Sequence, residues 1–216
     1  MKKATACICL FSLLMAGYCL YGCSPEHTEV HDRRLPAADF YIPDINLEAA
    51  IREELGKSHG ELLTVADMEQ LVDLIAENKG IEDLRGLEYA VNLVDLRLCS
   101  NRITDLVPLG NLTAVYRLHL SNNNIIDITP LSSLPYLEDL KLDGNNIVDI
   151  SLLSNNKSLR WVDLSSNEIA DISVLATNIF PLLEYVDLSG NELDMGQEES
   201  RARIEELLER IPDLRY

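Results

Sequence analysis

A sequence repeat of twenty-two residues occurs three times in succession, without a gap, between Leu93 and Ser158. The three units are LVDLRLCSNRITDLVPLGNLTA, VYRLHLSNNNIIDITPLSSLPY and LEDLKLDGNNIVDISLLSNNKS. A fourth unit, from Leu159, carries two extra residues before the next unit opens at Leu183, and an earlier, degenerate unit starts at Leu71. Self-similarity at this period is typical of a chain that stacks like units in a row, each one covering the core of its neighbour.

Each unit opens with a short alternation of apolar and polar residues, as in DLRLC, RLHLS and DLKLD, which predicts a strand. The apolar members would face inward: Leu96/Leu98, Leu118/Leu120, Leu140/Leu142, Val162/Leu164 and Val186/Leu188. Stacking the units would place these strands in one parallel sheet, about 4.8 Å apart. We therefore expect an α/β fold, a leucine-rich repeat solenoid with short parallel strands on the concave face and helical turns on the convex side.

Two polar residue types recur in fixed columns. One asparagine follows each strand, at Asn101, Asn123, Asn145, Asn167 and Asn191. An amide side chain both donates and accepts, so the column can satisfy the buried backbone groups of each turn. One aspartate precedes each apolar stretch, at Asp83, Asp105, Asp127, Asp149 and Asp171, where it can cap the amides of a helical turn. Because the positions repeat, a structural role is favoured over metal binding or acid–base chemistry.

Both ends of the repeat array need a cover. Residues 41–70 are expected to form a helical N-terminal cap, with Thr64 and Asp67 at the start of its second helical segment. One face of its first helix would hold Leu47, Ala50, Ile51 and Leu55. Residues 71–195 form the repeats, and residues 196–216 are expected to form a C-terminal capping helix. Its apolar side would hold Ile204, Leu207, Leu208 and Ile211. The alternative, a helix that binds a partner, is disfavoured because the segment has too few aromatic and methionine residues.

The N-terminus has the features of a bacterial lipoprotein signal. Lys2 and Lys3 precede a run of seventeen uncharged residues, ATACICLFSLLMAGYCL, which is short for a membrane anchor of about twenty residues. The run ends in LYGC, which resembles a lipobox, so residues 1–22 would be the signal peptide, Cys23 the lipidated residue and residues 23–40 a tether. The alternatives are an uncleaved anchor, or a Cys23 that is only a small residue at a cleavage site.

Charge and cysteine content argue against several classes of partner and site. Lys plus Arg number 18 against 36 Asp plus Glu, a formal charge of −18, which disfavours nucleic acid as a partner. Cleavage before Cys23 would remove two lysines and give −20. Only Cys23 and Cys99 would then remain, so a lipidated chain has no intrachain disulfide and no cysteine-rich metal site. No cofactor is expected.

The segments IPDINLEAAIREELGK and LTVADMEQLVDLIAENKGIEDLRGLEYAVNL resemble the N-terminal cap and first repeat of the internalin family. The resemblance covers roughly residues 41 to 195. It implies a bacterial surface protein with 22-residue leucine-rich repeats. The chain departs from the pattern where Leu152 and Val174 replace the prolines found at Pro108 and Pro130, and where Lys79 takes the asparagine position. The identity of a receptor is not carried over.

The outward positions of the strands are free to vary because they do not build the core, so we expect a binding site to lie among them. They gather cations in the middle of an acidic protein, next to the single tryptophan. Trp, Tyr and Arg are the residues that most often anchor protein interfaces. The candidate partner-binding residues are Arg97, Tyr116, Arg117, His119, Lys141, Trp161 and Tyr185. The alternative is that these are merely tolerated, solvated side chains; His119 with Cys99 alone makes a poor metal site.

Three functions follow. The favoured one is a monomeric, lipid-anchored bacterial surface protein whose concave face binds another protein, with adhesion or host interaction as the roles that the resemblance implies. The second is an envelope scaffold that faces the periplasm and holds a bacterial partner. The third, an enzyme, is disfavoured because no catalytic motif is present and an open groove does not exclude water. Ser24 is not the aspartate that retains many lipoproteins at the inner membrane, so the outer membrane or cell surface is the expected location.

Overall fold

The structure is a computed structural model that describes residues 40–177 and 179–216. The expected signal peptide, most of the tether and the candidate lipidation site Cys23 lie outside the described residues. Ala37–Tyr216 form one unit by their internal contacts. None of the helices described is long and apolar enough to cross a membrane.

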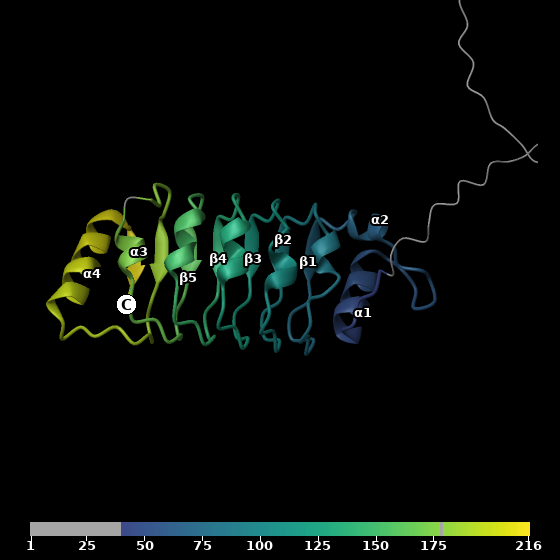
Figure 1. Ribbon diagram of the computed structural model, residues 1–216, viewed down its shortest axis with the longest axis horizontal. Helices are drawn as coiled ribbons and strands as arrows, with labels where there is room; N and C mark the ends of the chain where they lie inside the picture. Colours follow the sequence, from purple (N-terminus) through teal and green to yellow (C-terminus); the bar gives the residue numbers. More distant parts are fainter. Residues whose placement is uncertain (1–39, 178) are drawn as a thin grey trace, which may run out of the picture. The chain divides into compact units, whose positions relative to one another are not determined.

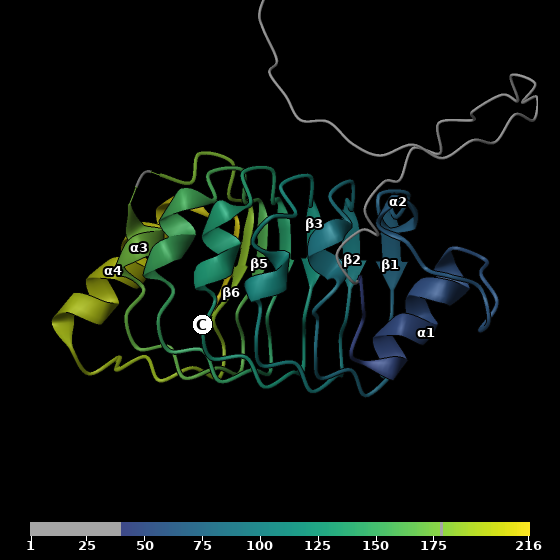
Figure 2. The same ribbon diagram turned by 45° about the vertical axis from the view of Figure 1, so that its right-hand side comes forward.

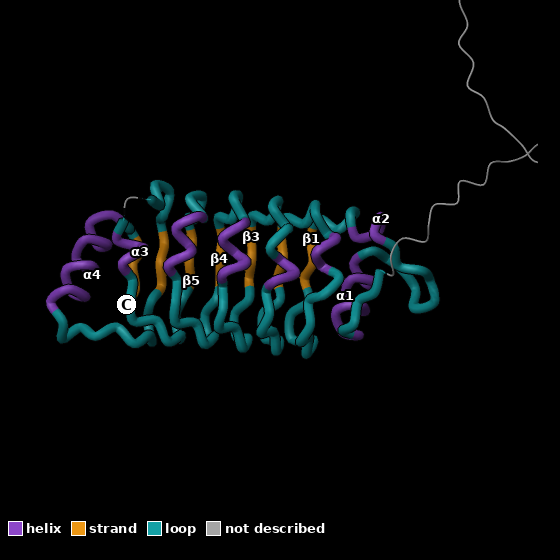
Figure 3. The backbone as a smooth tube through the Cα atoms, viewed as in Figure 1, coloured by secondary structure: helices purple, strands orange, loops and turns teal. Residues whose placement is uncertain are grey.

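The unit is a stack of strands joined by helical turns. Its sheet contains seven parallel strands in chain order, β1(Asp73–Ile75), β2(Asp95–Arg97), β3(Arg117–His119), β4(Asp139–Lys141), β5(Trp161–Asp163), β6(Tyr185–Asp187) and β7(Asp213–Arg215). A second row lies alongside the strands and holds the turns η1(Leu87–Tyr89), η2(Val107–Leu109), η3(Thr129–Ser133), η4(Ser151–Asn155) and α3(Ser173–Ala176) (Figures 1 and 3). The expected leucine-rich repeat solenoid is confirmed.

Strand register follows the repeat. Residues twenty-two apart are paired from β1 to β5, for example Leu96 with Leu118 and Leu118 with Leu140. The two extra residues of the fourth unit lie in the connection before β6, so Val162 still pairs with Val186. Because the strand period is two, an even number of extra residues placed between the strands leaves the inward and outward positions of β6 unchanged.

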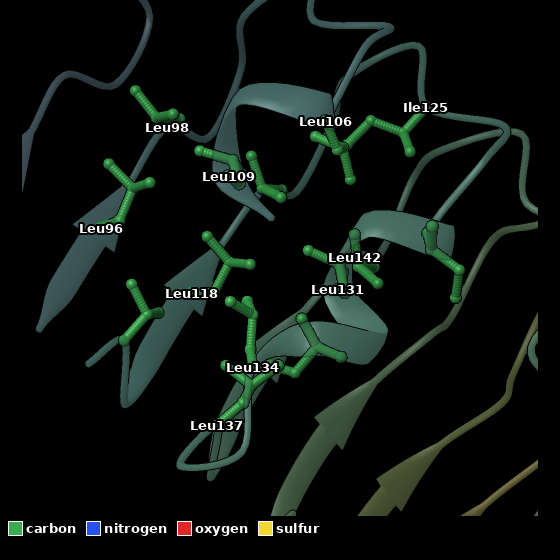
Figure 4. Packing of buried hydrophobic residues seen from close by; sticks show 14 of the residues in the cluster. Leu96, Leu98, Leu106, Leu109, Leu118, Ile125, Leu131, Leu134, Leu137 and Leu142 are labelled. Atoms are coloured by element: carbon green, nitrogen blue, oxygen red, sulfur yellow. The ribbon is translucent and has the colours of Figure 1, made fainter. Parts of the chain in front are cut away.

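The core lies between the strand row and the turn row. The central residue of each strand from β1 to β6 is fully buried, and Leu109 and Leu131 of the turns are buried in the same core as Leu96, Leu98 and Leu118 of the strands (Figure 4). Each such side chain contributes roughly 1.5–3 kcal/mol by leaving water. The expected inward positions of the strand residues are therefore confirmed.

Both polar columns have the roles expected of them. Asn145 donates from Nδ2 to the carbonyls of Leu120 (3.0 Å) and Leu142 (2.9 Å), while its Oδ1 accepts the Ile125 N–H (3.0 Å). The same bonds recur at the other four asparagines. Asp105 accepts the Val107 N–H at 2.8 Å, and equivalent bonds occur at all five aspartates.

The N-terminal end is closed by α1(Ile45–Glu54) and α2(Val65–Met68). Asp44 caps α1 through Oδ1, and its Oδ2 accepts the N–H groups of Glu82 (2.7 Å) and Asp83 (3.1 Å), so one side chain joins the cap to the first repeat. The expected capping box between Thr64 and Asp67 is present. These bonds pair the free amides at the starts of α1 and α2 and two amides of the loop that follows β1.

The C-terminal end holds an element that the pattern did not predict. α4(Glu198–Arg210) packs against α3 at the end of the turn row (Figure 2). It buries Ile204 and Leu207 as expected, but Leu208 is 48% exposed, because it is rotated about 100° from Leu207 and faces solvent. The chain then returns to the sheet as β7, which pairs with β6. Residues 196–216 are therefore a helix followed by a strand.

Candidate functional site

The concave face is formed by the outward side chains of the strands. We define it by three columns. The first column holds Asp73, Asp95, Arg117, Asp139, Trp161, Tyr185 and Asp213; the second holds Ile75, Arg97, His119, Lys141, Asp163, Asp187 and Arg215. The third lies two residues further on and holds Glu77, Cys99, Ser121, Asp143, Ser165 and Ser189. Six of the seven candidate residues lie in these columns.

The middle of the face is a chain of alternating charges. Arg117 lies between two aspartates, with Nη1 2.7 Å from Asp95 and Nε 2.9 Å from Asp139. Asp95 also accepts from Arg97, at 2.8 Å. The expected gathering of cations is present in position, but its arginines are bound to carboxylates of the same face.

His119 belongs to the same network through Asp139. Its Nε2 lies 3.2 Å from Asp139 Oδ1, and only 13% of the side chain is exposed, yet the nitrogen lacks a well-directed hydrogen bond. Burial by itself would raise the pKa of Asp139. The contacts and charges of His119 and Arg117 outweigh burial and lower that pKa to about 2, so Asp139 is a stable anion at neutral pH.

The aromatic residues lie toward the C-terminal half, on β5 and β6. Trp161 is 40% exposed, and Tyr185 occupies the same column on the next strand. With Lys141, Asp139 and Asp163, these two rings line a hollow of about 290 Å³, which the backbone of Leu140 and Val162 closes below because both side chains point into the core. The site is therefore an open, partly apolar depression with charged walls.

An arginine stacks against each of the two rings. The Arg160 guanidinium lies 5.1 Å from the centre of the Trp161 ring, and the Arg215 guanidinium lies 5.3 Å from the centre of the Tyr185 ring. Arg160 is fixed in turn by a hydrogen bond to Glu184. Such cation–π contacts are attractive and restrict the orientation of each ring. Neither arginine was among the sequence candidates: Arg160 precedes its strand, and Arg215 belongs to the unexpected β7.

Three aspartates border this half of the face. Asp163 accepts the Ser165 hydroxyl at 2.7 Å, Asp187 accepts the Ser189 hydroxyl at 2.6 Å, and Asp143 accepts from Ser121. The repeated Asp-x-Ser of β5 and β6, WVDLSS and YVDLSG, is the signal that could have drawn attention to the last two pairs. In each case the serine engages Oδ1.

Tyr116 is placed elsewhere. It precedes β3 by one residue, is not among the residues that line the hollow, and is half-buried beside Glu138, whose carboxylate raises the pKa of the phenol. Cys99 is half-buried, and burial raises the pKa of its thiol. Across residues 40–177 and 179–216, no group of three or more His, Cys, Asp or Glu side chains is arranged to hold a metal ion.

Comparison with known proteins gives structural neighbours only. No family model and no curated protein matches the chain. The structure of internalin C2 from Listeria monocytogenes is 31% identical with a TM-score of 0.57, and the match covers 76% of this chain and 81% of that one. A second internalin of the same species, InlF, is 26% identical with a TM-score of 0.54, over 81% of this chain and 62% of that one.

A leucine-rich repeat protein from Leptospira interrogans shares the fold with a TM-score of 0.59. It is 23% identical, over 75% of this chain and 42% of that one. The match therefore spans less than two thirds of InlF and of the Leptospira protein.

Proposed function

The chain belongs to the internalin family of bacterial leucine-rich repeat proteins, and from this premise we propose that it binds another protein through its concave face. One observation carries the proposal. Trp161, the only tryptophan of the chain, lies 40% exposed beside Tyr185 over a hollow, on a sheet face that no other part of the described chain covers. Large aromatic side chains lose most of their exposed apolar area when a partner covers them, and they dominate the energetics of protein interfaces.

The location belongs to the same proposal. LYGC at residues 20–23 supports lipidation of Cys23 after removal of the signal, which would tether the domain to a bacterial membrane. Surface exposure would place the concave face before proteins of a host or of neighbouring cells. Adhesion is then the role to which such binding would contribute.

A photo-crosslinking experiment in cells tests the binding face. Tyr185 and Tyr136 are native tyrosines, the first on the concave face and the second 65% exposed in the loop before β4. Each is replaced in turn by p-benzoylphenylalanine, which conserves an aromatic ring, and the cells are irradiated. We expect a defined crosslinked product at position 185 that is absent at position 136. Crosslinks at position 136 alone, or at neither position, would refute binding by the concave face.

Protease treatment of intact cells tests the location. Loss of the protein from intact cells, with lysed cells as the control for cleavability, would agree with surface exposure. Protection until lysis would favour the alternative, an envelope scaffold that faces the periplasm. Cys23→Ser should release the protein from the membrane fraction in either orientation, and retention of that variant would contradict the lipid anchor.

A further inference from the structure

We propose that the partner presents a basic segment to this face, with an arginine or lysine next to an apolar side chain. This inference rests on the proposed function and names the chemistry of the partner. The apolar side chain would enter the hollow between Trp161 and Tyr185, and the cation would bind the carboxylates of Asp163 and Asp143 beside it.

The charge of the domain supports a basic partner. Residues 1–39 hold four of the 18 basic and four of the 36 acidic residues, so residues 40–216 hold 14 and 32 and keep the whole formal charge of −18. A field of this sign attracts cationic surfaces and repels anionic ones, and it accelerates encounter at low ionic strength.

The concave face has the same imbalance. Its three columns hold four cations, Arg97, Arg117, Lys141 and Arg215. They hold eight carboxylates, Asp73, Glu77, Asp95, Asp139, Asp143, Asp163, Asp187 and Asp213. Arg97 and Arg117 are paired with Asp95 and Asp139, so these four charges on β2, β3 and β4 balance one another. The unbalanced negative charge lies at the two ends, and only the C-terminal end has the aromatic hollow.

Asp163, which lines the hollow, and Asp143, which lies in the third column two residues after Lys141, keep acceptors for a partner. Asp163 and Asp143 use Oδ1 for their serine bonds, and among the described residues no side chain forms an ion pair with either. Asp187 differs, because its Oδ2 already receives the Tyr185 hydroxyl at 3.2 Å and lies 3.8 Å from Arg215. A single cation can therefore meet Asp163 and Asp143 on neighbouring strands without displacing an existing ion pair.

The aromatic hollow and the available carboxylates together fit one type of partner side chain. Arginine and lysine have apolar stems that pack on aromatic rings and cationic heads that bind carboxylates. Trp161 and Asp163 flank Val162 on the same strand and face the same side of the sheet, so a stem over the ring places its head near the carboxylate. Lys141 opposes such a cation, since it lines the same hollow and has no ion pair among the described residues. Replacement of Lys141 should therefore have opposite effects on the affinity for a basic partner and for an acidic one.

The test uses a phage-displayed library of random peptides that lack tryptophan, selected against residues 24–216 at low ionic strength. We expect enrichment of peptides with arginine or lysine next to an apolar residue. The selected peptides are then synthesised and titrated against the protein, with the fluorescence of Trp161 as the readout of binding. Their affinity should fall as salt is added.

Matched variants localise the binding. Asp163→Asn should weaken the selected peptides by about tenfold or more, the loss expected for one charge-assisted bond. Glu205→Gln removes the same charge from an exposed position of α4 and should leave affinity within about twofold. Lys141→Glu should tighten binding severalfold. The thermal unfolding midpoint of each variant shows that the fold is retained.

Three results would overturn the inference. They are no enrichment over the unselected library, selection of acidic peptides that lose affinity in Lys141→Glu, and equal effects of Asp163→Asn and Glu205→Gln. Each of these can occur while crosslinking from position 185 still captures a partner, so the inference can fail while the binding function stands. Absence of that crosslink would count against the proposed function itself.

Discussion

Arg117 and Asp139 are bound to each other across neighbouring strands, with Nε 2.9 Å from Oδ2, and the other side of the same guanidinium holds Asp95 at 2.7 Å. The arginine is therefore a structural member of the sheet surface, because the two carboxylates it neutralises are only 14% and 16% exposed. Trp161, 40% exposed on β5, has no comparable role in holding strands together. Two residues that look alike as interface candidates in the sequence thus have different structural surroundings.

Arg117→Ala should destabilise the protein by about 1–2 kcal/mol, because it removes the cation that Asp95 and Asp139, two partly buried carboxylates on the strands on either side, share. Arg102 is the control, since it pairs with Glu82 while both side chains are more than 60% exposed. Its replacement by alanine should not change stability measurably. The measurement is urea unfolding followed by circular dichroism. Equal effects of the two substitutions would show that Arg117 is a surface charge like any other.

The ionisation of Asp139 should make stability depend on pH in acid. Its folded pKa is about 2, below the ordinary value of 3.8, so the folded state favours the anion. This contribution is complete above about pH 4 and is lost as pH falls toward 2, where the unfolded chain binds the proton first. It amounts to about 2 kcal/mol, given 1.36 kcal/mol for each pKa unit.

Asp139→Asn should therefore flatten the fall in unfolding free energy between about pH 4 and pH 2. Asp73→Asn is the matched control, because Asp73 occupies the same column on β1 and forms no ion pair with a described residue. Urea unfolding at a series of pH values measures both. An unchanged slope in Asp139→Asn would rule out a depressed pKa for Asp139.

The fold could be predicted from the sequence because the 22-residue repeat places the same residue types at the same positions in several units. Strand positions, the asparagine column and the aspartate caps all depend on contacts between adjacent units, and those contacts recur at a fixed spacing. β7 was missed because α4 interrupts the period before it. The triplet Asp213-Leu214-Arg215 repeats the Asp95-Leu96-Arg97 of β2, so a signal was present, but a single copy after a helix does not reveal its register.

The candidate site could be predicted only as a set of positions. Column membership follows from the repeat, and it correctly places Trp161 beside Tyr185 and Arg117 beside Asp139. Which cations form ion pairs with aspartates of the same face depends on the directions of side chains on neighbouring strands. The sequence could not show that Lys141 lies at the hollow while Arg117 is held by two aspartates. Arg160 was missed because a residue before the strand has no fixed face, and its position over the Trp161 ring is set by Glu184 on the next unit.

Asn145→Ala should cost about 1–3 kcal/mol of stability. The substitution leaves the Ile125 N–H without a partner in the interior, and it removes one of the two asparagine donors to each of the carbonyls of Leu120 and Leu142. Asn146→Ala, one residue further on and exposed, is the control and should change stability by less than about 0.5 kcal/mol. Chemical unfolding of both variants gives the difference. If the two losses match, the asparagine column does not support the turns.

Gly144 and Ser166 should respond to substitution in opposite directions. They occupy equivalent positions in adjacent units, in the left-handed region, with φ of +66° and +55°. In Gly144→Ala the new Cβ would be strained and would lie 2.6 Å from Asn122 Oδ1, so we expect a loss of about 1–2 kcal/mol. Ser166→Gly relieves the same strain, offset in part by the greater freedom of glycine in the unfolded chain, and should raise stability by up to about 1 kcal/mol. Thermal unfolding midpoints measure both, and a shift of the same sign in the two variants would contradict a shared left-handed turn.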